Sequence, residues 1–479
     1  MNLFLRKPIR SDAAKEVEGH QFKRHLGSFQ LTAIGIGAII GAGIFVITGK
    51  AASDYAGPAI IISFILAAIV CLFTGLCYAE LSSLIPISGG SYTYSYVAMG
   101  EFPAWLMGWA VTAQCLISAS TVAVGWSGYF KSILNDFGLS LPDSLSSSPI
   151  IYEAARGLEW SGSLINFPAI FLVGLVGILI SIGIQAAARF NHAMVFIKLA
   201  TILVFIAIGA FYIKPSNWSP FIPENTGIFG QFGISGIFRA SGLVFFAYLG
   251  FDTVSTLAQE AIKPQRDLPR GILGSITISA IAYIATALVL TGMVSYTALG
   301  VPDPMAVALN SIGPHVFWLS FAIKLAILAG LSSVVLVQLL GQTRIFYAIS
   351  KDGLLPSRFS SIHRATKSPL FSCVVTTLLA MLAAGLFPIN VLGQLVSIMT
   401  LFIFTIVCLG VWILRKTHPE YKRPFRAPFV PLVPILGIVT CVGQMCFLPL
   451  STWIQFILWM LLGLLTYFLY GYRHSKLRQ

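Results

Sequence analysis

The sequence predicts an all-α integral membrane protein with about twelve transmembrane helices. Of its 479 residues, 57% are hydrophobic and 10% are charged, whereas a water-soluble domain carries roughly 25% charged residues. Long apolar stretches recur from end to end, and about 18 such residues are enough to cross a bilayer as a helix. The predicted spans are 29–50, 58–80, 102–130, 164–187, 192–213, 236–259, 271–295, 316–348, 369–387, 390–414, 429–449 and 452–472.

Lysine and arginine fall mainly on one side of this predicted topology. With the N-terminus in the cytoplasm, 23 of the 30 basic residues lie in cytoplasmic segments and 4 on the opposite side. Cytoplasmic loops are enriched in basic residues, so both termini are expected in the cytoplasm. The net charge of +13 then reflects a basic face beside anionic headgroups. Membrane lipids are therefore expected partners, and nucleic acid is not.

Two spans differ from the others because glycine interrupts them. The first carries four glycines within nine residues, from Gly35 to Gly43, and the sixth carries Gly250 and Asp252 inside an apolar run. Interrupted helices at matching places in two halves indicate an inverted-repeat transporter with its site at the bilayer midplane. The predicted divisions are a tail (1–28), a five-helix repeat (29–213), an external loop (214–235), a second five-helix repeat (236–414), a cytoplasmic loop (415–428) and two appended helices with a tail (429–479).

Backbone chemistry at such breaks indicates the kind of solute. Unwound backbone at membrane depth is tolerated where it lines a cavity. The freed N–H groups, at the positive end of a half-helix, suit a carboxylate, and the freed carbonyls suit an ammonium group. Together they predict a receptor for a zwitterionic amino acid. The alternative is close helix packing, because Gly37 and Gly41 also fit a small-xxx-small pattern.

Four stretches, in order along the chain, carry a family resemblance. They are Gly41–Phe45; Glu80–Ser83 followed by Pro86–Tyr94; Phe245–Asp252 followed by Pro264–Ile272; and Gly341–Ala348 followed by Asp352–Pro356. With them the chain resembles the amino acid–polyamine–organocation superfamily, in its bacterial cationic amino acid transporter branch. The resemblance implies a leucine-transporter-like fold with five plus five helices, broken helices 1 and 6, and two appended helices. It also implies a location in the plasma (inner) membrane.

The resemblance implies roles for the residues at the breaks. Ala42 and Gly43 would offer N–H groups to the substrate carboxylate. Carbonyls at the two breaks would receive the substrate ammonium, and Phe246 would be an aromatic gate over the occupied site. For Phe246, ordinary helix packing is the alternative. The predicted binding residues here are Ile40, Gly41, Ala42, Gly43, Phe246, Ala247 and Leu249.

Lys198 is the main candidate residue for the predicted proton-coupling site. It lies about five residues into the fifth span, where a lysine is costly and marks function by default. In proton-coupled members of the family, a lysine here takes the place of a sodium ion and bridges the first and eighth helices. Ala329, Ser332 and Ser333 match the ion-contacting positions of the eighth span. Burial favours the neutral lysine and nearby carbonyls favour the charged one, so proton loss would loosen the helices. The alternative is a lysine that snorkels to the interface.

Three further polar residues bear on the substrate. Asp252 is expected either to meet a cationic substrate group or to cap the half-helix that resumes at Thr253. Gln114 stands where cationic-specific family members typically carry glutamate, so a buried cation would lack a counter-charge and a neutral or broader substrate range is plausible. Lys324, in the eighth span, is expected to snorkel outward or to repel cations from the outer vestibule.

These observations predict a secondary active amino acid transporter that takes up its substrate by alternating access, coupled to protons. An exchanger without net proton movement is the rival. A membrane-embedded enzyme is disfavoured, because the seven histidines lie in tails, loops or span edges. The seven cysteines contain no CxxC pair. We therefore expect no catalytic residue, metal or cofactor, and the sequence leaves the oligomeric state and the particular amino acid open.

Overall fold

A computed structural model describes residues 4–7, 26–86, 90–153, 157–182, 184–258, 260–363 and 368–478. Most of the predicted N-terminal tail, and residues 87–89 of the second motif, lie outside the described residues. Nearly all of the described chain is helical. The helices are α1 (Ser28–Ile39), α2 (Thr48–Ala51), α3 (Ile60–Leu84), α4 (Gly90–Ala98), α5 (Glu101–Asp136), α6 (Asp143–Ser146), α7 (Phe167–Ile182), α8 (Ile184–Gly209), α9 (Gly233–Val244), α10 (Thr253–Thr256), α11 (Pro264–Met293), α12 (Pro304–Asn310), α13 (Phe317–Lys351), α14 (Leu370–Leu386), α15 (Ile389–Thr417), α16 (Leu432–Cys446), α17 (Leu450–Thr466) and α18 (Tyr472–His474).

Each of the twelve predicted spans coincides with helix. Eight helical segments of the described chain are long and apolar enough to cross a membrane, and four shorter apolar helices (α1, α7, α14 and α16) cover the remaining spans. Outer helices present large apolar side chains to the outside, such as Leu175 on α7, Leu382 on α14 and Leu461 on α17. A lipid-facing surface needs that pattern, because hydrocarbon takes the place of water there. The prediction of a multi-span, all-α membrane protein is confirmed.

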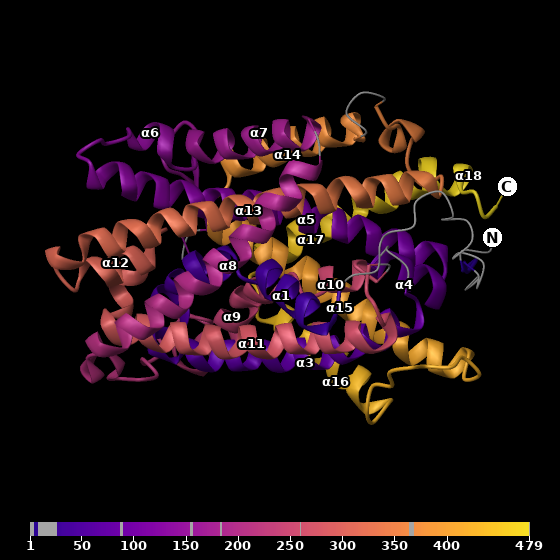
Figure 1. The fold of residues 1–479 in the computed structure, drawn as a ribbon, viewed down its shortest axis with the longest axis horizontal. Coiled ribbons are helices and arrows are strands. Elements are labelled where there is room, and N and C mark those ends of the chain that lie inside the picture. Colours follow the sequence, from indigo (N-terminus) through magenta and orange to yellow (C-terminus); the bar gives the residue numbers. More distant parts are fainter. Residues whose placement is uncertain are drawn as a thin grey trace.

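The two broken spans occupy the middle of the bundle. Figure 1 shows α1, α9 and α10 enclosed by longer helices. Helices α3 and α8 contact the broken spans, α11 packs on α1, and α13 packs on α5 and α8. The central position explains why the half-helices are almost wholly buried, with Ile40, Ile44, Phe245 and Ala247 all at 1% exposure or less.

Both chain ends lie at one end of the bundle, which we call the terminus side (residues 4–7 and 472–478; Figure 1). Lys7 forms an ion pair with Asp352 at 2.6 Å, and the Lys476 N–H donates to the Asp352 carbonyl at 3.1 Å. The Glu101 N–H donates to the Leu5 carbonyl at 2.9 Å. An even number of spans places the termini together in this way.

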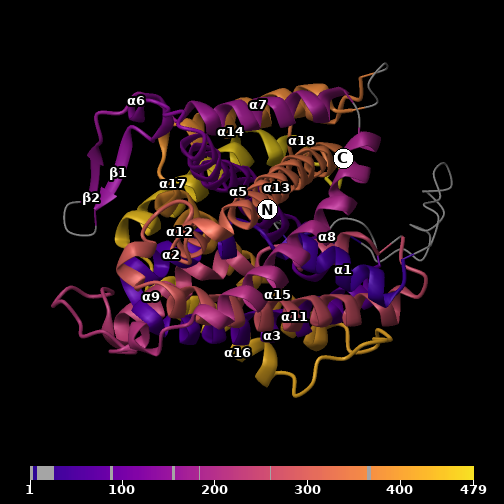
Figure 2. The ribbon, with the colours of Figure 1, turned by 60° about the vertical axis from the view of Figure 1, so that its left-hand side comes forward.

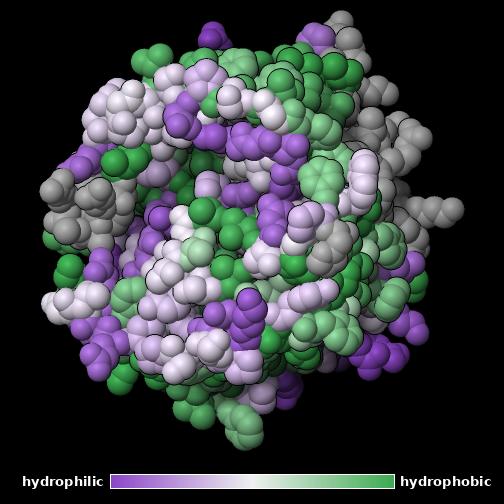
Figure 3. Space-filling model, turned by 90° about the vertical axis from the view of Figure 1, so that its left-hand side faces the viewer, coloured by the Kyte–Doolittle hydropathy of each residue, from purple (hydrophilic) through white to green (hydrophobic). Residues whose placement is uncertain are grey.

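The opposite end, the hairpin side, holds α6, α12 and the strands β1 (Ile150–Glu153) and β2 (Gly157–Trp160). The strands pair antiparallel, with Ile150 opposite Trp160 (Figure 2). Figure 3 looks onto this side and shows hydrophilic residues over much of it, mixed with hydrophobic ones. The predicted spans leave 131–163 as a connecting segment between the third and fourth helices, and the hairpin within it was not predicted.

Candidate functional site

The first span is interrupted near its middle. Helix α1 ends at Ile39, and Ile40 is extended, with φ −69° and ψ 107°. Helix resumes as a π-helix over Gly43–Ile47, which continues into α2. The first N–H groups of a helix have no partner within it, so those of Ala42 and Gly43 are left without an intrahelical acceptor. The break predicted at 40–43 is present.

The sixth span is interrupted at the same level. Helix α9 ends at Val244, a 3₁₀ turn covers Phe245–Tyr248, and Leu249 is extended, with ψ 133°. Gly250 has φ +125°, which L side chains rarely adopt. Asp252 precedes α10 with no side-chain capping hydrogen bond. The backbone conformation at the break therefore requires glycine at position 250. Asp252 does not cap α10, because its side chain makes no hydrogen bond to the first N–H groups of that helix.

The two breaks touch each other through backbone. A Cβ atom placed on Gly43 would lie 2.2 Å from the Ala247 Cα, closer than real contacts allow. One placed on Gly250 would lie 2.6 Å from the carbonyl carbon of Ala38. Glycine is thus required at both crossings, and the unwound segments form one continuous site.

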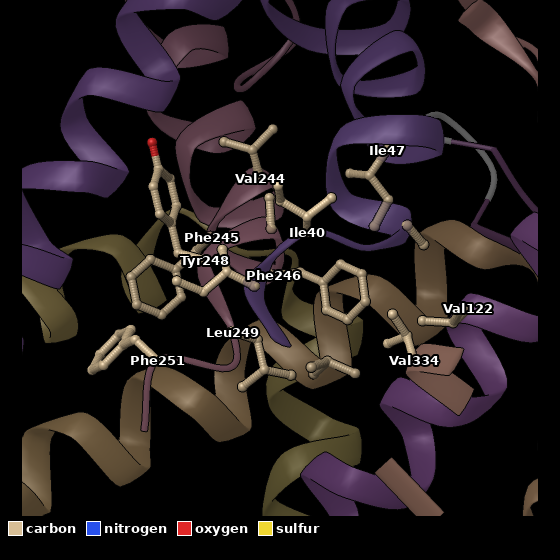
Figure 4. Packing of buried hydrophobic residues seen from close by; sticks show 14 of the residues in the cluster. Ile40, Ile47, Val122, Val244, Phe245, Phe246, Tyr248, Leu249, Phe251 and Val334 are labelled. Atoms are coloured by element: carbon tan, nitrogen blue, oxygen red, sulfur yellow. The ribbon is translucent and has the colours of Figure 1, made fainter. Parts of the chain in front are cut away.

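A small cavity lies against these crossings, with room for about one water molecule. Phe246 stands at its edge: Figure 4 shows its ring turned toward Val122 and Val334, while Phe245, Tyr248 and Phe251 point the other way. The arrangement fits a closed site under an aromatic side chain. The lining residues are Ala38, Ile39, Gly41, Ala42, Gly43, Ser118, Val122, Phe246, Leu249, Val334 and Gln338.

Tyr283, on α11, joins the two breaks. Its hydroxyl lies 2.9 Å from the Ile39 carbonyl and 2.9 Å from the Ala247 carbonyl. One hydroxyl proton serves only one of these acceptors at a time. The Ala247 carbonyl, predicted to receive a substrate ammonium, therefore already has a donor beside it.

Lys198, on α8, is buried, with 1% exposure. Its Nζ donates to the Gly37 carbonyl at 3.1 Å. Its aliphatic stem packs against Gly330 of α13, where an added Cβ atom would lie 2.9 Å from the Lys198 Cγ. It lines a second small cavity, which shares Ala38, Val334 and Gln338 with the first. The snorkelling alternative is wrong, because the side chain turns inward between α1 and α13.

The three predicted partners of Lys198 on α13 make no hydrogen bond to it in the described structure. The Ser332 hydroxyl donates to the Leu328 carbonyl and the Ser333 hydroxyl to the Gly330 carbonyl, both within their own helix. Ala329 is half-buried. A role for these residues in proton coupling stays a prediction, because Gly330 provides the observed packing.

The remaining predicted residues lie outside both cavities. Gln114 is buried on α5, one turn from Ser118, and its Oε1 has no hydrogen-bond partner among the described residues. Asp252 is half-buried beyond the sixth-span break. Lys324 does not snorkel, because it is 1% exposed and pairs with Asp136 at 2.7 Å. The predicted snorkelling was wrong because Asp136, at the end of α5, pairs with Lys324. An analysis of the eighth span alone cannot identify a partner on another helix.

Sequence reasoning missed seven residues of the site: Ala38 and Ile39 beside the first break, and Ser118, Val122, Tyr283, Val334 and Gln338 on other helices. Ser118 carried a usable signal, since it lies one turn from Gln114 on α5. Gln338 carried another, as a polar residue inside an apolar span. Tyr283, Val122 and Val334 carried none, because such residues are common in any span and only packing brings them to the breaks.

Comparison with known proteins adds the family. Residues 26–470 match the family model described as amino acid permease. The chain belongs to the amino acid permease family. This permease is 42% identical to the methylthioribose transporter of Bacillus subtilis, over 100% of both chains. It is 40% identical to the branched-chain amino acid permease of the same organism, over 100% of this chain and 99% of the relative.

The chain is also similar to a plant transporter that is named for cationic amino acids. The permease is 35% identical to cationic amino acid transporter 9 of Arabidopsis thaliana, over 91% of this chain and 75% of the relative. All three relatives are named as transporters or permeases and not as enzymes, so the family resemblance and the transport prediction are confirmed. Among the residues that the structure describes, no group of three or more His, Cys, Asp or Glu side chains is placed to hold a metal ion.

Proposed function

We propose that this permease imports a neutral amino acid across the plasma membrane by alternating access, driven by protons through Lys198. The observation that carries the proposal is the meeting of the two breaks at Gly43 and Ala247. The N–H groups of Ala42 and Gly43 then bind the carboxylate, and carbonyls at Ile40, Phe246 and Leu249 bind the ammonium. Phe246 covers the occupied site.

Electrostatics support a neutral side chain. Neither cavity is lined by an acidic side chain in the described part of the chain, and Lys198 lies in the wall of one. A cationic side chain would therefore be buried without a counter-charge, which costs several kcal/mol. Two relatives above are named for methylthioribose, which is an uncharged sugar, and for branched-chain amino acids, whose side chains carry no charge.

The position of Lys198 supports its role as the coupling residue. It connects α8 to the carbonyl of Gly37 on α1 and packs against Gly330 on α13. Loss of its proton weakens the charge-assisted bond to Gly37, which frees α1 to move from α8. Because basic residues favour the cytoplasmic face, the terminus side is assigned to the cytoplasm, and substrate is released there.

The test is transport into liposomes that contain the purified protein and no internal amino acid. A thermal-stabilisation screen against all amino acids first identifies the substrate. An inward proton gradient is then expected to drive accumulation, whereas an exchanger accumulates label only when the lumen is preloaded.

Lys198→Ala is expected to abolish gradient-driven uptake and to retain exchange of labelled for unlabelled substrate. Lys131→Ala, which alters a half-buried lysine on the hairpin side, is the matched control and is expected to behave as wild type. Concentrative uptake by Lys198→Ala along a proton gradient would eliminate the proposed coupling.

A further inference from the structure

The loop between α15 and α16 (residues 418–431) projects at the terminus side (Figure 1) and is held in one shape by hydrogen bonds. The guanidinium of Arg423, whose side chain is 4% exposed, donates to three backbone carbonyls within residues 414–421, at 2.9 to 3.2 Å. The Ala427 N–H donates to the buried carboxylate of Glu80 on α3 at 2.8 Å. A loop that is already ordered loses little conformational entropy when it binds a partner.

Two other basic side chains of this loop are turned outward. Lys422 and Arg426 lie on either side of Arg423 in the sequence, are exposed, and have no acidic partner within the described part of the chain. Glu420 is the one acid in the loop sequence, and its Oε1 lies 3.0 Å from Nδ1 of His418. The outward surface of the loop is therefore cationic, and lysine and arginine are the residues that bind phosphate groups.

The same loop carries an exposed aromatic ring at its end. Phe429 is 80% exposed and has φ +47°, a backbone conformation that is rare for a bulky side chain. Such strained residues persist where the surrounding structure imposes them, and they cluster at binding sites. Three residues later α16 begins with Leu432, which is 54% exposed, and Val439, two turns further on, is 60% exposed. These two side chains share one helix face, which meets hydrocarbon in a membrane.

We propose that Lys422, Arg426 and Phe429, which we call the headgroup surface, bind an anionic phospholipid of the adjoining leaflet. The two cations contact the lipid phosphate, and the Phe429 ring inserts beside the first part of an acyl chain. The lipid-facing side of α16 leads directly to Phe429, so the cations lie at the level where headgroups begin. That continuity favours a lipid over an acidic protein or a nucleic acid. The inference goes beyond the proposed function and does not depend on it, because it concerns the lipid and not the solute.

The number of cations sets the size of the expected effect. Each lysine or arginine near an anionic lipid surface raises affinity about fivefold, so the pair favours an anionic over a zwitterionic headgroup by about 25-fold. At physiological ionic strength, charges more than about 8 Å away are largely screened. Basic residues elsewhere on the terminus side therefore contribute little to a lipid bound at this surface.

The test is the melting temperature of the purified full-length protein in detergent, titrated with phosphatidylglycerol or with phosphatidylcholine of the same acyl chains at physiological ionic strength. Half-maximal stabilisation is expected at about 25-fold lower phosphatidylglycerol than phosphatidylcholine. Lys422→Gln/Arg426→Gln is expected to abolish this difference. Lys351→Gln/Arg358→Gln, which removes two exposed basic side chains near the end of α13, is the matched control and is expected to keep it.

Phe429→Asn separates the ring from the charges. Asparagine tolerates a positive φ better than phenylalanine, so the variant is expected to be at least as stable as the wild type in detergent alone. Loss of the inserted ring is expected to weaken binding of both lipids by about tenfold, while the preference for the anionic headgroup stays. A purely structural role of Phe429 would instead lower the melting temperature without lipid.

Three results would overturn the headgroup surface. One is equal half-maximal concentrations of the two lipids in the wild type. Another is the same loss of preference in both double variants, which would mean that the whole basic face attracts lipid without a defined site. The third is equal stabilisation by inorganic phosphate at the same concentration, which would indicate a simple anion site. None of the three bears on amino acid transport.

Discussion

The ammonium group of Lys324 on α13 donates to both carboxylate oxygens of Asp136 at the end of α5, at 2.9 and 2.7 Å. The lysine is 1% exposed and the aspartate 17%. The pair joins the hairpin-side ends of α5 and α13.

Asp136→Ala is expected to lower stability by about 3–5 kcal/mol, because it leaves the Lys324 charge buried without this partner. The measurement is the thermal midpoint of the purified protein. Lys131→Ala breaks the pair with Asp143, whose side chain is 84% exposed, and should change stability by no more than about 1 kcal/mol. Equal effects of the two variants would show that burial of the Lys324 pair is unimportant.

Tyr283→Phe removes the hydroxyl beside the Ile39 and Ala247 carbonyls. We expect a loss of about 1–3 kcal/mol in stability and weaker solute binding, because the two breaks are no longer held together. Tyr248→Phe removes a buried hydroxyl that donates to the Phe64 carbonyl of α3 at 3.0 Å. It should cost similar stability with unchanged binding, measured by isothermal titration. Unchanged binding in Tyr283→Phe would contradict the role of Tyr283.

Gly43→Ala forces a methyl group into the Ala247 backbone, 2.2 Å from its Cα. Such overpacking costs about 1–3 kcal/mol, and here it separates the half-helices, so uptake should fall to background. Gly443→Ala, on α16, meets nothing within 4 Å and should express and transport as wild type. Normal uptake by Gly43→Ala would mean that the breaks need not touch.

Glu80, 2% exposed at the terminus-side end of α3, accepts from Arg415 at 2.9 and 2.6 Å and from the Ala427 N–H at 2.8 Å. Glu80→Ala should destabilise the loop 415–428 by about 3–5 kcal/mol, since it leaves Arg415 and a buried amide without this acceptor. Faster proteolysis of that loop is the readout. Glu420→Ala is the control, because Glu420 lies in the same loop and its side chain is 61% exposed. Equal cleavage of the two variants would show that Glu80 does not hold the loop 415–428 in place.

Much of the fold was predictable because each span is a local property. About twenty apolar residues must form a helix in hydrocarbon, and all twelve predicted spans coincide with helix. The glycines at 43 and 250 likewise indicated where backbone comes close, and the structure places both at the crossings of α1 and the sixth span. The β1–β2 hairpin was missed because its strands are four residues each, too short for a periodic signal.

By itself, the sequence determined the apolar spans, the glycines that interrupt two of them and the presence of a lysine within the fifth, because hydrophobic length and residue position act within one segment. The tertiary structure alone decided which side chains meet at the breaks. Tyr283 reaches two carbonyls and Lys324 pairs with Asp136 only through the rotation and register of helices far apart in the chain. Those are set by side-chain packing between segments, which no single stretch of sequence contains.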